Sequence, residues 1–141
     1  MTLSMFAAGA ARPPIANVTY EPGVCNIGPD EIRRRRRSGH VGAVATVVLL
    51  AILVAIGAPP LARLILVLHA AGSAAGYLQA WLKFCAGFGS RGVFNFGRVG
   101  EMQDVVDDDA RRRDRSRAVR IDLASLVIGV AIAVVAVLLQ L

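Results

Sequence analysis

Three long apolar stretches, at residues 41–58, 64–82 and 123–141, constrain this chain more than any other feature. A helix needs about 20 apolar residues to cross a bilayer core of roughly 30 Å, and each stretch comes close to that length. Hydrophobic residues make up 55% of the chain and are concentrated in blocks, without the alternation of a soluble amphipathic fold. The sequence therefore predicts an all-α membrane protein with three transmembrane helices.

The basic residues are divided unequally by these stretches. Of the 16 Lys and Arg residues, 15 precede the first stretch or lie between the second and third, and Arg63 alone lies in the short link between the first two. Cytoplasmic segments of membrane proteins carry an excess of Lys and Arg. We therefore expect a multi-pass protein of the cytoplasmic (inner) membrane with its N-terminus in the cytoplasm and its C-terminus outside. No nucleic-acid partner is expected, because the net charge of +6 has this simpler origin.

The chain divides into two parts. Prolines and glycines punctuate residues 1–28, which predicts an irregular N-terminal arm. Residues 29–141 form the predicted three-helix membrane domain, with spans at about 41–58, 61–83 and 122–141. Pro60 suits a first helical turn, so the first two spans are expected to form a tight hairpin. A cytoplasmic loop and charged helix at 84–121 would lead into the third span.

Two spans carry small residues at four-residue spacing, which lets helix backbones approach closely in lipid. One stripe comprises Gly72, Gly76 and Ala80, and the other comprises Ser125, Gly129 and Ala133. Each predicts helix packing, either within the chain or against another membrane protein subunit or a second copy. Before the first span, a basic run is a candidate site for anionic lipid headgroups: Arg33, Arg34, Arg35, Arg36 and Arg37.

His69 is the one ionisable residue well inside a predicted span. Such residues usually face protein or a cavity, so His69 could bind a haem or chlorophyll-type cofactor or donate a hydrogen bond to a neighbouring helix. Cys25, Cys85 and His40 all fall near the predicted cytoplasmic face and could bind zinc or copper. Their ligand set is incomplete, and small buried cysteines with an interfacial histidine are the alternative. We therefore expect no resident cofactor.

No catalytic set of nucleophile, base and acid can be assembled from these residues, so we expect a protein that is not an enzyme. The sequence favours an accessory or structural subunit of a larger membrane complex, such as an energy-converting one. A small cofactor- or metal-binding membrane protein using His69 or the two cysteines is one alternative. A homo-oligomeric channel is another.

Two strings of the sequence carry a resemblance to a known group. Residues 25–32 read Cys-Asn-Ile-Gly-Pro-Asp-Glu-Ile, and residues 77–80 read Tyr-Leu-Gln-Ala, followed by Phe84 and Cys85. With these strings the chain resembles a loose group of uncharacterised small bacterial inner-membrane proteins over about residues 20–130. The resemblance implies a bacterial inner-membrane protein with about three helices, and it supplies no functional residues.

Overall fold

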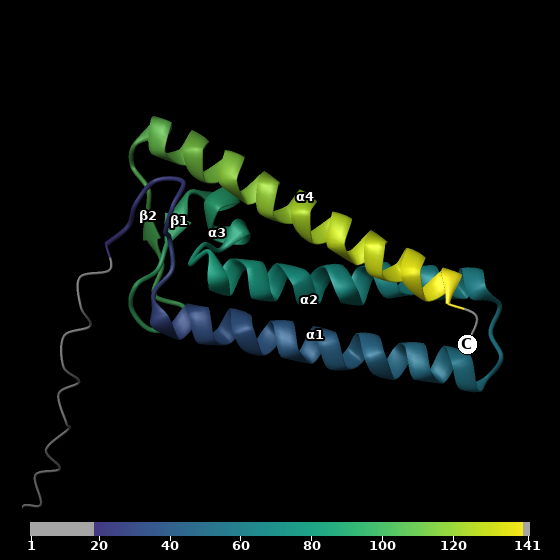
Figure 1. Cartoon of the computed structure of the whole chain (residues 1–141). Coiled ribbons are helices and arrows are strands. Elements are labelled where there is room, and N and C mark those ends of the chain that lie inside the picture. The colour runs from purple at the N-terminus through teal and green to yellow at the C-terminus, as the bar shows by residue number, and fades with distance from the viewer. Residues whose placement is uncertain (1–18, 140–141) are drawn as a thin grey trace, which may run out of the picture.

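In the computed structural model, which describes residues 19–139, three long helices lie side by side and a small mixed unit covers one end of them (Figure 1). The described elements are α1 (Pro29–Ala55), the 3-10 helix η1 (Pro60–Ile65), α2 (Leu66–Trp81), α3 (Ala86–Arg91), β1 (Val93–Phe94), β2 (Gln103–Asp104) and α4 (Asp108–Leu138). Three segments are each long and apolar enough to cross a membrane: α1, η1 together with α2, and α4. The prediction of a mostly helical chain with three candidate spans is confirmed, and β1 and β2 add a short sheet that the all-α prediction lacked.

Local sequence explains where the long helices begin and end. Pro29 occupies the first turn of α1, and Asp30 and Glu31 follow it at the positive end of the helix dipole. After α1 the chain turns at Gly57, whose φ of +65° is left-handed and favours glycine. The side chain of Asp107 accepts hydrogen bonds from two backbone N–H groups in the first turn of α4 and so caps that helix.

Helix α2 lies between α1 and α4 and packs against both. Glycines make the contact with α1 very close: a Cβ at Gly76 would lie 2.5 Å from the backbone nitrogen of Gly39, and one at Gly42 would lie 2.9 Å from Ser73. Ser73 also donates a hydrogen bond to the carbonyl of Gly39, at 2.8 Å. On the other side, a Cβ at Gly129 of α4 would lie 2.7 Å from the Cβ of Ala71. Small residues therefore set the spacing of all three helices.

A compact unit, which we call the polar head, lies at one end of the bundle (Figure 1). It consists of residues 20–28, residues 83–107 and the first turns of α4 (108–120). Strands β1 and β2 pair antiparallel, with Val93 opposite Asp104. Ile27 and Phe84 are fully buried in it. Residues 25–28, which the sequence assigns to the N-terminal arm, are thus buried within the polar head; residues 1–18 of the predicted arm lie outside the described residues.

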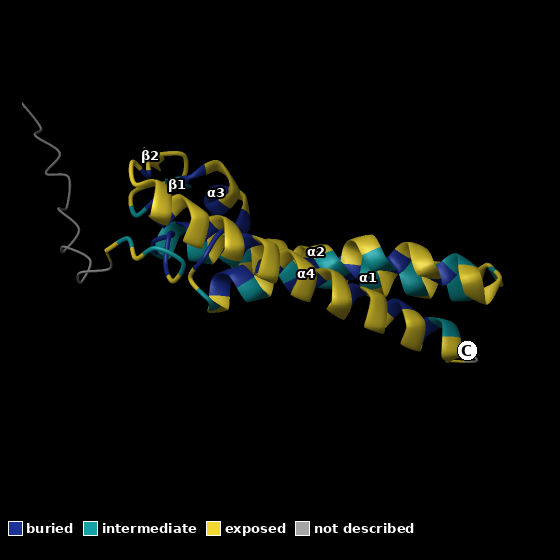
Figure 2. Cartoon of the chain, turned by 90° about the horizontal axis from the view of Figure 1, so that it is seen from above, coloured by how far each residue is buried: buried dark blue, intermediate teal, exposed yellow. Residues whose placement is uncertain are grey.

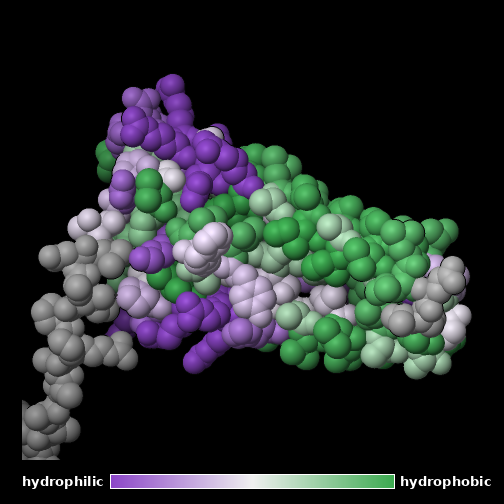
Figure 3. All heavy atoms as spheres, viewed as in Figure 1, coloured by the Kyte–Doolittle hydropathy of each residue, from purple (hydrophilic) through white to green (hydrophobic). Residues whose placement is uncertain are grey.

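The molecular surface changes character along the bundle. Hydrophilic residues gather on the polar head and on the adjoining start of α1, and hydrophobic ones predominate towards the other end of the bundle (Figure 3). The long helices expose much of their length (Figure 2), including large apolar side chains such as Val47 and Val127, each 67% exposed. Water would penalise so much exposed apolar surface, whereas lipid would not. The three-helix part therefore has the length and the apolar surface expected of a membrane-embedded region.

Candidate functional site

The predicted stripe on α2 divides into two environments. Gly76 and Ala80 are buried, and Gly76 lies directly against α1. Gly72 instead is exposed, and a Cβ there would meet nothing within 4 Å. Of the predicted packing stripe, Gly76 and Ala80 therefore pack within the chain, and packing of Gly72 against another chain stays a prediction. Positions four apart rotate by about 40° around an α-helix, so residues two steps apart along a stripe need not share one neighbour.

The stripe on α4 faces α2. Ser125, Gly129 and Ala133 are all buried, and Ala133 belongs to a small core with Leu66 and Ala136. Ser125 donates its hydroxyl proton to the carbonyl of Ile121 within the same helix, at 2.7 Å. This stripe is an internal contact of the chain and is not free for another subunit.

His69 lies on an exposed part of α2, next to Gly72 and to Leu68, which is 74% exposed. No hydrogen bond to its imidazole is formed by any of residues 19–139. The side chain therefore lies on the exposed surface of the apolar bundle, with open space one turn away at Gly72. His69 is thus a polar side chain within an apolar helix that has no partner among the described residues.

The structure does not bring Cys25, Cys85 and His40 together. Cys25 lies 3.8 Å from the carbonyl of Ile27, and the Arg35 guanidinium lies 2.9 Å from the Cys85 sulfur. His40 hydrogen-bonds through Nδ1 to the hydroxyl of Tyr77, at 2.6 Å. Within residues 19–139, no three His, Cys, Asp or Glu side chains are grouped as metal ligands. The predicted three-residue metal set is therefore not assembled in this part of the chain.

Both cysteines are buried free thiols. Burial raises the pKa of Cys25, and it raises the pKa of Cys85 despite the opposing charge of Arg35. A raised pKa keeps the thiol protonated at neutral pH, which disfavours both nucleophilic attack and metal binding. The two cysteines therefore behave as core residues.

Asn26 has a structural role that the sequence analysis missed. Its amide nitrogen donates to the carbonyl of Cys85 at 3.1 Å, and its carbonyl oxygen accepts from the backbone N–H of Cys85 at 2.7 Å. The Asn26 backbone also bonds to Lys83 and Asn95, so the backbone and side chain of this one buried residue together join three segments. Asp114 acts similarly from α4: fully buried, it accepts hydrogen bonds from the Tyr20 hydroxyl at 2.8 Å and from the Gly23 N–H at 2.7 Å. Burial, followed by the Asp114 hydrogen bond, raises the pKa of Tyr20, so the phenol stays protonated.

The arginine run on α1 does not act as one uniform headgroup site. Arg33, Arg34, Arg36 and Arg37 are exposed. Arg33 pairs with Asp30, and Arg34 lies 3.8 Å from the Glu31 carboxylate. Arg35 is half-buried: it lies 4.0 Å from the buried Glu31 carboxylate and 5.9 Å from the centre of the Phe88 ring. The prediction that all five arginines face lipid headgroups is therefore wrong for Arg35, which points into the polar head.

Arg63 is a second finding that sequence analysis did not anticipate. It is buried at the far end of the bundle and donates hydrogen bonds to the carbonyls of Ala136 and Leu139, at 2.7 and 2.6 Å. These carbonyls lie at the end of α4, where a helix leaves its last C=O groups without internal partners. The positive charge of Arg63 and the hydrogen bonds that it donates both stabilise the negative end of the α4 dipole.

No protein-family model, curated protein or solved structure matches this chain.

Proposed function

We propose that the protein is a non-enzymatic accessory or structural subunit of a larger membrane complex, such as an energy-converting one, in a bacterial inner membrane. The observation that carries this proposal is the exposed surface of α2 at His69, Gly72 and Leu68, which we call the His69 face. An imidazole without a partner is costly in hydrocarbon, so such residues usually face protein. A hydrogen bond from the helix of another subunit would satisfy it.

Gly72 strengthens this argument. It lies one turn from His69, has no side chain, and is not used by the chain's own packing. Glycines in spanning helices let a second helix approach closely, so the donor on that helix can reach the imidazole. The polar group and the space for a partner therefore coincide on one face.

The orientation we propose places the polar head in the cytoplasm. The head and the start of α1 contain almost all of the basic residues, whereas Arg63 lies at the opposite end of the bundle. By the positive-inside rule the N-terminus is then cytoplasmic and the C-terminus lies outside. In this orientation the His69 face is inside the bilayer, nearer to the outer surface.

The experiment compares complexes formed in native membranes by the parent and by His69→Leu, Gly72→Leu and Ala131→Leu. After mild-detergent solubilisation, native electrophoresis with mass spectrometry of each band reports the complex. His69→Leu and Gly72→Leu should shift the protein from a defined larger band to its own size. Ala131→Leu, a small-to-large change on an exposed part of α4, is the matched control and should leave the band intact. Retention of the band in all variants, or no larger band in the parent, contradicts the proposal.

Binding of a cofactor by His69 is the second candidate, favoured by the open space beside Gly72. The absorbance spectrum of the purified protein tests it. A visible band that disappears in His69→Leu supports a pigment or haem ligand.

A further inference from the structure

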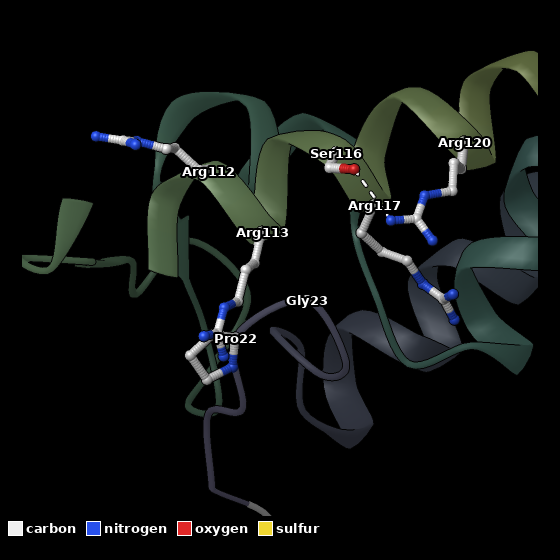
Figure 4. Close-up of a pocket in the computed structure, with 7 residues that line it drawn as sticks. All are labelled: Pro22, Gly23, Arg112, Arg113, Ser116, Arg117 and Arg120. Atoms are coloured by element: carbon white, nitrogen blue, oxygen red, sulfur yellow. Dashed lines mark hydrogen bonds between the residues drawn. The ribbon is translucent and has the colours of Figure 1, made fainter. Parts of the chain in front are cut away.

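A pocket in the polar head is lined by arginines from one face of α4. Figure 4 shows Arg113, Arg117 and Arg120 on the side of the helix near the turn at Pro22 and Gly23, while Arg112 points away from it. The spacing of three and four residues places Arg113, Arg117 and Arg120 along one helical face. The opposite wall is the backbone of the turn, and a Cβ at Gly23 would lie 3.3 Å from the Cβ of Arg113. The pocket has a volume of about 380 Å³.

Within residues 19–139, no ion pair joins Arg113, Arg117 or Arg120 to an acidic side chain. Asp114 is fully buried and accepts hydrogen bonds from the Tyr20 hydroxyl and the Gly23 N–H, so its carboxylate fixes the turn. Asp109 lies 3.9 Å from Arg112, which points away from the turn. The pocket is thus lined by three guanidinium groups, that of Arg113 beside Pro22 and those of Arg117 and Arg120 further along α4 (Figure 4).

Hydrogen-bonding capacity in the pocket is also unused. The Nε of Arg117 is buried and has no acceptor anywhere in residues 19–139. Ser116, at the rim, accepts a hydrogen bond from Arg120 at 3.0 Å. A buried donor without an acceptor is unfavourable. Because this nitrogen is covered by protein atoms, an anion in the pocket would contact the terminal nitrogens of the guanidinium.

We propose that this pocket binds a phosphate group, carried either by an anionic phospholipid or by free phosphate or a soluble phosphate ester. Guanidinium forks match phosphate oxygens in geometry and charge, and they bind them bidentately. The position of Arg120 on α4 fits a lipid phosphate, since it precedes the apolar stretch at Leu123 by about 4.5 Å along the helix axis. Arg117 and Arg113 precede that stretch by about 9 and about 15 Å. The polar headgroup layer on each side of the bilayer spans roughly 5–8 Å.

The test measures binding by native mass spectrometry on the full-length protein in a neutral detergent. One arm adds phosphatidylglycerol, and the other adds inorganic phosphate or glycerol phosphate. Arg117→Gln and Arg113→Gln should each weaken binding roughly tenfold, because each removes a charge-assisted contact. Arg115→Gln is the matched control: it removes the same charge from an exposed position of α4 outside the pocket. Circular dichroism verifies that each variant remains helical, and two independent pocket variants keep the test decisive if one unfolds.

The two arms distinguish the source of the phosphate. Binding of phosphatidylglycerol that is lost in the pocket variants, without binding of soluble phosphate, establishes a lipid site. Binding of soluble phosphate with the same dependence on Arg113 and Arg117 establishes a soluble ligand. If neither probe binds, or if Arg115→Gln weakens binding as much as the pocket variants do, the proposal is overturned.

Discussion

Asn26 shows how a single side chain can hold a helix end in place. It pairs with both main-chain groups of Cys85, 59 positions away, in a buried environment where water cannot replace it. A buried N–H or C=O that loses its partner costs about 1–3 kcal/mol. Asn26 therefore contributes to stability through the hydrogen bonds that its side chain makes with the N–H and C=O of Cys85, and not through its own burial.

We predict that Asn26→Ala lowers the free energy of unfolding by about 1–3 kcal/mol, because it leaves the buried N–H of Cys85 without a partner and removes one of the two hydrogen bonds that the carbonyl of Cys85 accepts. Unfolding in sodium dodecyl sulfate, followed by circular dichroism, measures the change. Gln103→Ala removes a polar side chain from an exposed strand position and should change stability by no more than about 0.5 kcal/mol. Similar effects of the two substitutions would show that the Asn26 hydrogen bonds contribute little.

Cys85 should react slowly with alkylating reagents in the folded protein. The thiol is 1% exposed and its pKa is raised by burial, so at neutral pH the thiolate fraction is smaller than for free cysteine. In a Cys25→Ser background, the rate should keep rising with pH beyond about 8.5, the ordinary pKa of the thiol. Denaturation in sodium dodecyl sulfate should restore the rate of a free thiol. Fast labelling of the folded protein at pH 7 would indicate an accessible, activated cysteine instead.

At the scale of elements, the apolar spans could be predicted because they depend on local composition alone. The polar head could not, because its contacts join distant residues: Tyr20 and Asp114 are 94 positions apart. Strands of two residues carry no periodic pattern that could have revealed β1 and β2. Part of the candidate site was predictable, since His69 stands out as a polar residue in a span. The open space beside it at Gly72 depends on which way α2 faces, which composition does not determine.

The contrast between glycines on α2 and α4 gives a matched set of variants. Gly76→Leu and Gly129→Leu should each destabilise the isolated chain by about 1–3 kcal/mol, because a Cβ at either position would already lie within 2.8 Å of a neighbouring helix. Gly72→Leu should leave the stability of the isolated chain almost unchanged, since nothing lies within 4 Å there. Unfolding in sodium dodecyl sulfate compares the three. Equal losses in all of them would mean that glycine packing does not set the helix spacing.

The whole molecule is polarised along its long axis. One end holds the polar head and the start of α1 with its arginines, and the other holds the turn between α1 and η1 together with the end of α4 (Figure 1). Between the first turns of α1 and the turn at residues 82–85, the chain runs along the bundle twice, first through α1 and then back through η1 and α2. These two segments must therefore lie on the same side of any membrane that the three helices span. The polarity of the head and the charge asymmetry of the sequence thus support the same orientation.

That orientation predicts opposite accessibility for cysteines introduced at the two ends. Ala58→Cys lies in the turn between α1 and η1, and Ser90→Cys lies on an exposed position of α3 in the polar head. In intact cells, a membrane-impermeant maleimide should label the first and not the second, and after lysis it should label both. The parent protein is the control, because its two cysteines are buried and should remain unlabelled. Labelling of Ser90→Cys alone in intact cells would place the polar head outside, with its arginine pocket facing the outer leaflet, and would show that another force overrides the positive-inside rule in this chain.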